Sequence, residues 1–302
     1  MKNPNFKLSL KVILAVLLLA ACQSTKKESI SSVWLKKALE TEQYLQTAKI
    51  DSDIGMTWKV MPDSTNSGAD VSLYSGTPGI VLFYLGLFEA SGDGKFLESA
   101  KAGADYLFTS LQTETVSANE VGLYTGLAGI GYTFGEVYKA TGLVRYKEGL
   151  LKTIDLLERS AEKTPYGIHW GSTTDIVYGA AGIGLFLNEV AHEFNLPKAD
   201  SLSRQAARQL LEQMTRETDG IRWKMSPDMD IHMDNFSHGT AGVAYYLLQM
   251  HVQTEEIVYL ETAVAAGNWL LSHSTEQGQV SHHLPGGEEL YYQSWCHGPA
   301  GT

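Results

Sequence analysis

Cysteine is nearly absent from this sequence, since the chain of 302 residues contains only Cys22 and Cys296. Cys22 closes an N-terminal targeting segment, which leaves Cys296 without a disulfide partner in the chain. An unpaired thiol beside a histidine, here His297, is a candidate metal ligand or nucleophile, whereas a buried and inert cysteine is the commoner case. Cysteine usage therefore leaves a single thiol to explain.

Basic residues are in the minority, with 23 Lys and Arg against 34 Asp and Glu and a net charge of −11. Loss of residues 1–21, which hold three lysines and no acidic residue, would change the net charge to −14. Nucleic acids bind basic surfaces, so this balance argues against a nucleic-acid partner. The oligomeric state stays open.

The N-terminal apolar stretch, residues 12–21, is too short to span a bilayer. Lysines precede it and Cys22 follows it, as in a secretory signal. The Leu-Ala-Ala-Cys sequence at residues 19–22 resembles the lipobox of bacterial lipoproteins. The resemblance implies cleavage before Cys22, lipidation of its thiol, and a membrane-anchored protein at the outer membrane or the periplasmic face rather than in the cytoplasm. An uncleaved anchor and a soluble secreted protein are the alternatives.

Glycine is plentiful, and its spacing organises the chain. A glycine followed three residues later by a second one recurs with leading glycines at positions 76, 126, 179, 239 and 298. Copies 50 to 60 residues apart indicate a repeat architecture. We expect the missing side chains to let neighbouring helices approach closely.

Two kinds of helix are predicted between these glycines. The segments that follow them, such as 74–90 and 179–190, are apolar nearly all round and must be covered on every side. Amphipathic segments lie at about 33–45, 95–111, 143–157, 198–214 and 255–272. An inner apolar helix alternating with an outer amphipathic one predicts an all-α fold of helical hairpins, closed as an α/α toroid. We expect residues 1–21 to be the signal peptide, 22–32 a tether and 33–302 the toroid domain.

Polar side chains gather just before the glycines. His238 and His297 immediately precede a leading glycine, while Asp175 and Asn235 lie four residues before one. The N-terminal ends of helices expose N–H groups that favour anions. We therefore expect a functional site at the mouth formed by these ends.

A looser repeat places tryptophans 58, 170 and 223 in loops that rim the same mouth. These tryptophans either form an aromatic floor for a ligand or seal the loops onto the barrel. Three further histidines, at positions 232, 282 and 283, also lie in entry loops, where we interpret them as solvated or ligand-contacting.

The Ser-His-Gly-Thr-Ala-Gly sequence at 237–242 and the Ser-Trp-Cys-His-Gly-Pro-Ala-Gly sequence at 294–301 resemble the lanthionine synthetase C-like family. That family includes the cyclases that close thioether rings in lantibiotic peptides, and relatives without this activity. The resemblance covers about residues 33–302 and implies seven inner helices around a central zinc. Because five inner-helix starts are visible, we expect a toroid that is incomplete and truncated after Thr302.

The resemblance also implies roles for individual residues. Cys296 is implied as a zinc ligand, His238 as an acid/base and Asp175 as its orienting or substrate-contacting partner. His297, where cyclases often carry tyrosine, is a third candidate catalytic residue, and Tyr292 stands where peptide cyclases usually carry arginine. The family's other two zinc ligands belong to a later repeat that this sequence lacks, so the implied zinc site is incomplete.

The implied activity is addition of a zinc-activated thiol to a dehydroalanine or dehydrobutyrine residue of a peptide, with His238 protonating the enolate. Whether the chain is an active enzyme stays open, because a peptide cyclase would ordinarily act before export. One alternative is an exported α/α-barrel glycosidase or lyase acting on a glycan. It rests on the lipoprotein signal, on the tryptophan loops and on four acidic residues, Asp175, Asp228, Asp230 and Asp234. The other alternative is a non-catalytic, peptide-binding toroid.

Overall fold

A computed structural model of the chain describes residues 30–61, 68–113 and 120–302. These residues fall into two units, divided between Gln46 and Thr47. The described part of the first unit is most of helix α2 (Ile30–Ala48), which covers the helix expected at 33–45 and begins within the expected tether. The expected signal peptide and Cys22 lie outside the described residues. None of the described helices is both long and apolar enough to cross a membrane.

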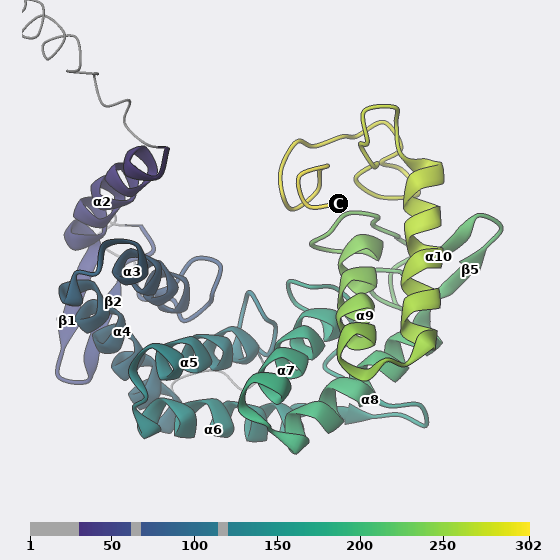
Figure 1. Cartoon of the computed structure of the whole chain (residues 1–302). Helices are drawn as coiled ribbons and strands as arrows, with labels where there is room; N and C mark the ends of the chain where they lie inside the picture. The colour runs from purple at the N-terminus through teal and green to yellow at the C-terminus, as the bar shows by residue number, and fades with distance from the viewer. Residues whose placement is uncertain (1–29, 62–67, 114–119) are drawn as a thin grey trace, which may run out of the picture. The chain divides into compact units, whose positions relative to one another are not determined.

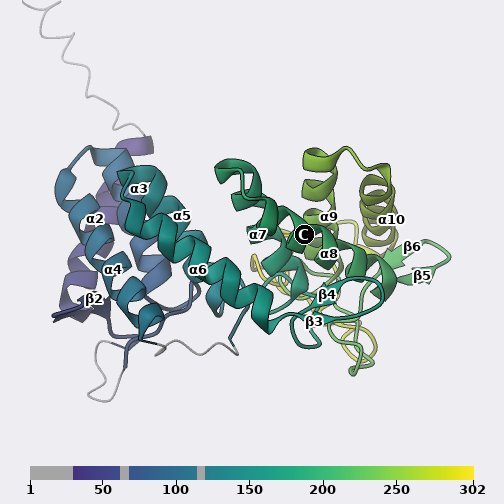
Figure 2. The same ribbon diagram turned by 90° about the horizontal axis from the view of Figure 1, so that it is seen from below.

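Helical hairpins make up most of the second unit, residues 47–302. Four are present among its described residues: α3 (Thr77–Ser91) with α4 (Gly94–Gln112), α5 (Leu127–Thr141) with α6 (Val144–Ser160), α7 (Ala180–Phe194) with α8 (Pro197–Gln213), and α9 (Thr240–Thr254) with α10 (Ile257–His273). The first helix of each pair contacts the first helix of the next, in the order α3, α5, α7, α9 (Figures 1 and 2). The expected alternation of inner and outer helices is confirmed.

The four inner helices have the same length and the same kind of end. Each is fifteen residues long and is followed by a residue in the left-handed conformation, at Gly92, Gly142, Asn195 or Glu255. Glycine adopts positive φ without a steric penalty and asparagine tolerates it, which explains three of these four ends. The turn starts the outer helix at once, so inner and outer helices pack as antiparallel neighbours.

The core of the second unit lies between inner and outer helices. Phe134 of α5 is fully buried, and its ring would lie 2.9 Å from a Cβ atom at Gly149 of α6. Tyr246 of α9 is equally buried and donates its hydroxyl proton to the carbonyl oxygen of Ser203 on α8, at 2.7 Å. Each such side chain contributes about 1.5–3 kcal/mol by leaving water, and the polar atom of the tyrosine is satisfied.

The paired glycines contact a different partner from the one we expected. A Cβ atom on Gly239 would lie 1.5 Å from the carbonyl oxygen of Met233, and one on Gly242 would lie 2.1 Å from that of Phe236. The same contact, with the carbonyl oxygen six residues earlier, recurs at every copy of both glycines. Each glycine pair therefore lets the preceding loop fold back over the first turn of its own helix. The next contact comes from a loop of the preceding repeat and not from a helix, since a Cβ atom on Gly242 would lie 2.5 Å from the side chain of Ile176.

Three short antiparallel hairpins, which the sequence did not predict, precede inner helices within the described part of the chain. They pair β1 (Lys49–Ser52) with β2 (Gly55–Trp58), β3 (Glu162–Lys163) with β4 (Ile168–His169), and β5 (Thr215–Glu217) with β6 (Gly220–Arg222). Their glycines close onto outer helices, since a Cβ atom at Gly220 would lie 2.3 Å from the carbonyl oxygen of Ala265 on α10.

The tryptophans of these hairpins seal them onto the helices. Nε1 of Trp170 donates to the carbonyl oxygen of Leu157, and Nε1 of Trp223 donates to that of Leu210, each at 2.8 Å. All three repeated tryptophans, the third being Trp58, are at most 2% exposed. The interpretation as an aromatic floor is therefore wrong for Trp58 and Trp223, whereas Trp170 both seals its hairpin and lines a cavity.

Candidate functional site

Five loops with one backbone pattern surround the N-terminal ends of the inner helices. These rim loops run from six residues before each leading glycine to that glycine, at 70–76, 120–126, 173–179, 233–239 and 292–298. Backbone hydrogen bonds join several of them: the N–H of Tyr74 donates to the carbonyl of Tyr124, at 3.0 Å, and that of Tyr124 to Val177, at 3.1 Å. The N–H of Ser237 donates to the carbonyl of Cys296, at 3.2 Å. Equivalent positions in different repeats are thereby brought side by side.

The fifth rim loop carries the Trp-Cys-His-Gly sequence and is held over the others. The ring of Trp295 packs against Tyr124 and Phe236, with centroid distances of 5.4 Å to each. The segment lies at the N-terminal end of α9, where the yellow C-terminal trace runs in Figure 1. At the expected start of a fifth inner helix, residues 294–301 form turns, with a 2.8 Å bond from the N–H of Gly298 to the carbonyl oxygen of Ser294.

Asp175 and His238 form a hydrogen-bonded pair between the third and fourth rim loops. Nδ1 of His238 lies 2.8 Å from Oδ2 of Asp175. A carboxylate only accepts hydrogen bonds, so Nδ1 carries the proton and Nε2 is left to take up or release one. Asp175 is fully buried, whereas the His238 side chain is 16% exposed. The pair can therefore hold one imidazole in a fixed tautomer at the edge of the solvent.

The loops themselves orient this pair. Oδ1 of Asp175 accepts the backbone N–H groups of Tyr178 and Gly179, at 2.6 and 2.8 Å. Asn235 does the same for its own loop by accepting the N–H of His238 at 2.9 Å. Ser72 and Ser294 hold the same position and accept a backbone N–H through their hydroxyls, whereas Gly122 has no side chain to do so. Among the described residues at this position, only Asp175 has a second carboxylate oxygen, and His238 is bonded to it.

Aromatic rings surround the exposed side of His238. The Tyr178 ring stacks on it at 5.7 Å with an interplanar angle of 16°, and the His297 ring lies 5.2 Å away. Beyond them, His282 lies 4.6 Å from His297, and Tyr292 lies within 5.6 Å of both. The structure therefore brings the three candidate catalytic residues together, and adds Tyr178 and His282.

The two outer histidines favour the neutral form. Burial lowers the pKa of His297, and the charges that His282 and His238 would carry lower it further. Burial also lowers the pKa of His282, with added effects from His283 and His238. Nδ1 of His297 is buried and has no hydrogen-bond partner in the described part of the chain.

Cys296 is half-buried and forms no disulfide. It occupies the same repeat position as Ser237, two residues before a leading glycine, and the two are hydrogen-bonded. Its backbone carbonyl accepts both the N–H and the hydroxyl of Ser237, the latter at 2.7 Å. A catalytic zinc needs three protein ligands. Within the described residues, Cys296 does not belong to any group of three His, Cys, Asp or Glu side chains with ligand atoms within 4.8 Å of one another. These residues therefore do not fit a complete zinc site.

The described residues contain one such group elsewhere, formed by Glu136 on α5 and by Glu189 and Glu193 on α7. Lys139 already pairs with two of its carboxylates, at 3.0 Å to Glu136 and 2.9 Å to Glu193. The group offers only oxygen ligands, which suit zinc poorly beside the nitrogen and sulfur ligands it prefers. It is not a substitute for the implied site.

In the described part of the chain, the remaining acidic candidates form no hydrogen bond with the Asp175–His238 pair. Asp234 is buried and accepts hydrogen bonds from Thr240 and Trp269, which is a structural role. Asp230 is exposed and paired with Lys224 at 2.9 Å, and Asp228 is exposed.

The three entry-loop histidines differ from one another in burial. His232 is only 7% exposed, and burial, helped by the charges of Arg222 and Lys224, lowers its pKa to about 4. Its interpretation as solvated is therefore wrong. His282 and His283 are half-buried and adjoin each other, with Nδ1 atoms 2.8 Å apart.

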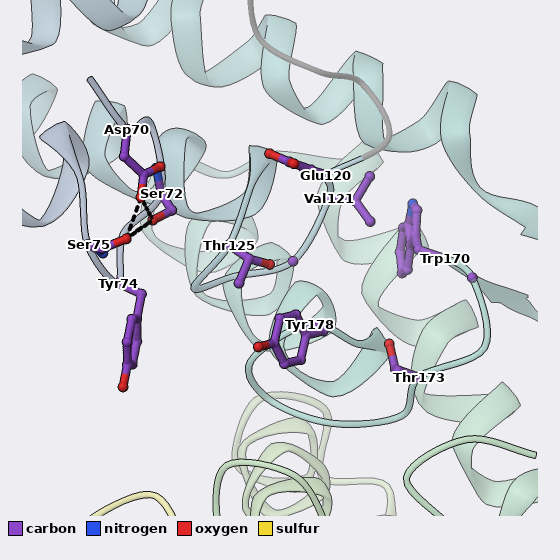
Figure 3. Close-up of a pocket in the computed structure, with 12 residues that line it drawn as sticks. Asp70, Ser72, Tyr74, Ser75, Glu120, Val121, Thr125, Trp170, Thr173 and Tyr178 are labelled. Atoms are coloured by element: carbon purple, nitrogen blue, oxygen red, sulfur yellow. Dashed lines mark hydrogen bonds between the residues drawn. The ribbon is translucent and has the colours of Figure 1, made fainter. Parts of the chain in front are cut away.

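A cavity of about 590 Å³ lies among the first three rim loops (Figure 3). Its lining includes Asp70 and Tyr74 from the first rim loop, Glu120 from the second and Tyr178 from the third, together with Trp170, which precedes the third loop. Tyr178 also stacks on His238, so the cavity and the Asp175–His238 pair share one wall.

The sequence prediction missed Asp70, Glu120 and Tyr178. The repeat register carries a signal for them, because Asp70 and Glu120 each lie six residues before a leading glycine and Tyr178 immediately precedes one.

The sequence comparison identifies the family. A profile described as "Lanthionine synthetase C-like protein" matches residues 67–302. The chain belongs to the lanthionine synthetase C-like family. No curated protein matches this family member in sequence.

Solved structures resemble this lanthionine synthetase C-like chain in fold. Nisin cyclase matches with a TM-score of 0.65 and 15% identity over 99% of this chain and 80% of its own. An unsaturated glucuronyl hydrolase from Streptococcus agalactiae matches with a TM-score of 0.57 and 13% identity over 84% and 67%. A GH76 alpha-mannanase from Bacteroides thetaiotaomicron matches with a TM-score of 0.53 and 10% identity over 84% and 73%. The likeness establishes the fold alone, which is the predicted α/α toroid type.

Proposed function

We propose that this lanthionine synthetase C-like chain modifies peptides by adding a thiol to a dehydroalanine or dehydrobutyrine residue, forming a thioether. The observation that carries the proposal is the hydrogen bond between Asp175 and His238, which leaves Nε2 of an oriented histidine at the mouth of the toroid. General acid–base catalysis by a positioned histidine accelerates a reaction by about 10²–10⁴-fold.

The proposed reaction uses one histidine twice. Nε2 of His238 takes the proton of the substrate thiol, and the thiolate sulfur bonds to the β-carbon of the dehydro residue. The electrons of the carbon–carbon double bond move towards the carbonyl group to give an enolate. The imidazolium of His238 then returns the proton to the α-carbon, so the addition consumes no oxidant or reductant. Asp175 stabilises the imidazolium that exists between the two transfers.

Zinc is implied by the resemblance but has no step in this reaction. Cys296 is the ligand that the resemblance assigns. Among the described residues, no two further His, Cys, Asp or Glu side chains lie close enough to complete a three-ligand site with it. Zinc content is therefore a separate measurement, on the purified chain and on Cys296→Ala. One zinc per chain that is lost in the variant would support a metal centre at Cys296.

The glycan alternative retains the likeness in fold, the export signal and Trp170, which lines the cavity. The other two tryptophans are buried, and Asp175 and Asp234 are engaged by His238 and Trp269. A glycosidase requires two carboxylates placed across a bound sugar, and these residues do not provide that pair.

The experiment incubates the purified chain with a dehydroalanine peptide and a small thiol, and follows the thioether product by mass spectrometry. A rate above that of buffer supports the proposal. Hydrolysis of an oligosaccharide without any thioether product would favour the glycan alternative, and peptide binding without turnover would favour a non-catalytic toroid.

We also propose that the mature protein is exported and anchored through a lipid on Cys22. The support is the Leu-Ala-Ala-Cys sequence at residues 19–22. Mass spectrometry of the mature N-terminus in a bacterial host is expected to give a lipid-modified Cys22, and Cys22→Ala to release the protein from the membrane fraction. An unmodified N-terminus at Met1 would contradict the proposal.

A further inference from the structure

The cavity among the first three rim loops carries negative charge and has no positive charge to balance it. Its twelve lining residues include Asp70 and Glu120 but no lysine, arginine or histidine. Neither carboxylate takes part in an ion pair within the described residues. A half-enclosed space with this charge attracts cations and repels anions.

Asp70 is built into the wall rather than merely exposed at it. Oδ1 accepts the backbone N–H of Ser72 and Oδ2 accepts its hydroxyl, each at 2.8 Å, and the hydroxyl of Ser75 also donates to Oδ2. Figure 3 shows these bonds at one side of the cavity. Burial alone would raise the pKa of Asp70, but the bonds from Ser75 and Ser72 bring it below its usual value. The group is thus a fixed carboxylate at neutral pH.

Two tyrosines supply aromatic surface to the same cavity. Tyr74 is 65% exposed and Tyr178 is 46% exposed, although Tyr178 also stacks on His238. A cation beside a tyrosine ring gains about 0.5–1 kcal/mol at an exposed site. Carboxylates and ring faces together fit a long cationic side chain, because its apolar stem can lie on the rings while its charge meets a carboxylate.

We propose that this cavity binds a lysine or arginine side chain of the peptide whose reacting residue lies at His238. The inference rests on the proposed function and adds to it a preference for basic residues near the modification. Tyr178 is the element that joins the two places, since one ring borders both the cavity and the imidazole. Glu120 and Asp70 are the residues that select the charge.

The test measures binding alone, by titration calorimetry with blocked pentapeptides. The peptides carry alanine where a reacting residue would stand and differ at one position, which is lysine, arginine or norleucine. Blocked termini remove the competing charges of the ends. We expect the basic peptides to bind about tenfold more tightly than the norleucine peptide, with the difference shrinking as salt is added.

Variants locate the preference. Glu120→Gln removes one carboxylate while keeping the backbone bond from Leu127 to residue 120, and we expect it to lower the preference for lysine severalfold. Asp70→Asn tests the second carboxylate. The matched control is Glu89→Gln, which removes an exposed carboxylate near the far end of α3, outside the cavity, and should keep the full preference.

Several results would overturn the inference. They are equal binding of lysine and norleucine peptides, a preference that survives both cavity variants, and no binding of any peptide up to about 1 mM. Binding of maltotriose that is insensitive to these variants, without a preference for lysine, would indicate a sugar site instead. If the preference holds but no thioether forms, the proposed function fails and the binding site stands. If thioether forms without a preference, this inference fails alone.

Discussion

Asp175 uses its two carboxylate oxygens for two different tasks, because Oδ1 accepts the turn N–H groups of Tyr178 and Gly179 while Oδ2 lies 2.8 Å from Nδ1 of His238. The residue that builds the third rim loop therefore also orients a histidine of the fourth. Two repeats are tied together by the same group that fixes the tautomer.

This double role predicts different stabilities for two substitutions. Asp175→Ala removes the partner of two backbone N–H groups and of one imidazole N–H, of which the N–H of Gly179 is buried, and should lower the free energy of unfolding by at least about 1–3 kcal/mol. Asp175→Asn retains an oxygen for the turn and should cost less. Urea unfolding measures both. The same stability in wild type and alanine variant would show that the turn does not depend on this group.

Alanine substitution is expected to change stability in opposite directions at Gly239, which belongs to a glycine pair, and at Gly267, which does not. Gly239→Ala would place a Cβ atom 1.5 Å from the carbonyl of Met233, so we expect a loss of at least about 2 kcal/mol. Gly267 lies in the middle of α10, where an added Cβ atom would meet no neighbouring atom within 4 Å. Gly267→Ala should therefore raise the free energy of unfolding by about 0.5–1 kcal/mol. Thermal unfolding of the two proteins compares them directly. A Gly239→Ala protein as stable as the Gly267→Ala protein would refute the close fold-back of the loop.

The repeat and its helices were predictable because two spacings carry them. Glycines 50 to 60 residues apart mark the copies, and apolar and amphipathic segments alternate between them. The β-hairpins were missed because they are at most four residues per strand and follow no apolar alternation. The contact partner of the paired glycines was predicted wrongly because it is a backbone carbonyl oxygen. Every residue has one, so the sequence does not reveal which carbonyl lies against the glycine.

The sequence singled out His238, His297 and Asp175 by their places relative to the glycines, and Cys296 as the one cysteine left unpaired. What sequence could not supply was the register between repeats, which depends on backbone bonds such as that from Ser237 to Cys296. The burial of His232 also follows from tertiary packing, so its local sequence gave no warning.

His232 predicts a pH dependence of stability. Its pKa in the folded chain is about 4, mainly because of burial, whereas an unfolded histidine has about 6.5. Between these values the unfolded chain binds more protons, so stability falls as the pH is lowered through this window. At pH 5 the loss from this group is about 2 kcal/mol.

The check on His232 is urea unfolding at pH 7 and pH 5 for wild type and His232→Gln. The variant should lose about 2 kcal/mol less than wild type between the two pH values. His282 and His297 also have lowered pKa values, but they are present in both proteins and cancel in the comparison. Identical losses in the two proteins would argue against a neutral, buried His232.

The most direct test of the central claim is the rate of thioether formation by wild type, Asp175→Asn and His238→Gln, with a dehydroalanine peptide and a small thiol. His251→Gln, a substitution at the end of α9 away from the rim loops, is the matched control. The account predicts a loss of about 10²–10⁴-fold for both dyad variants in folded protein, and an unchanged rate for the control. Dyad variants that turn over as fast as wild type would contradict it.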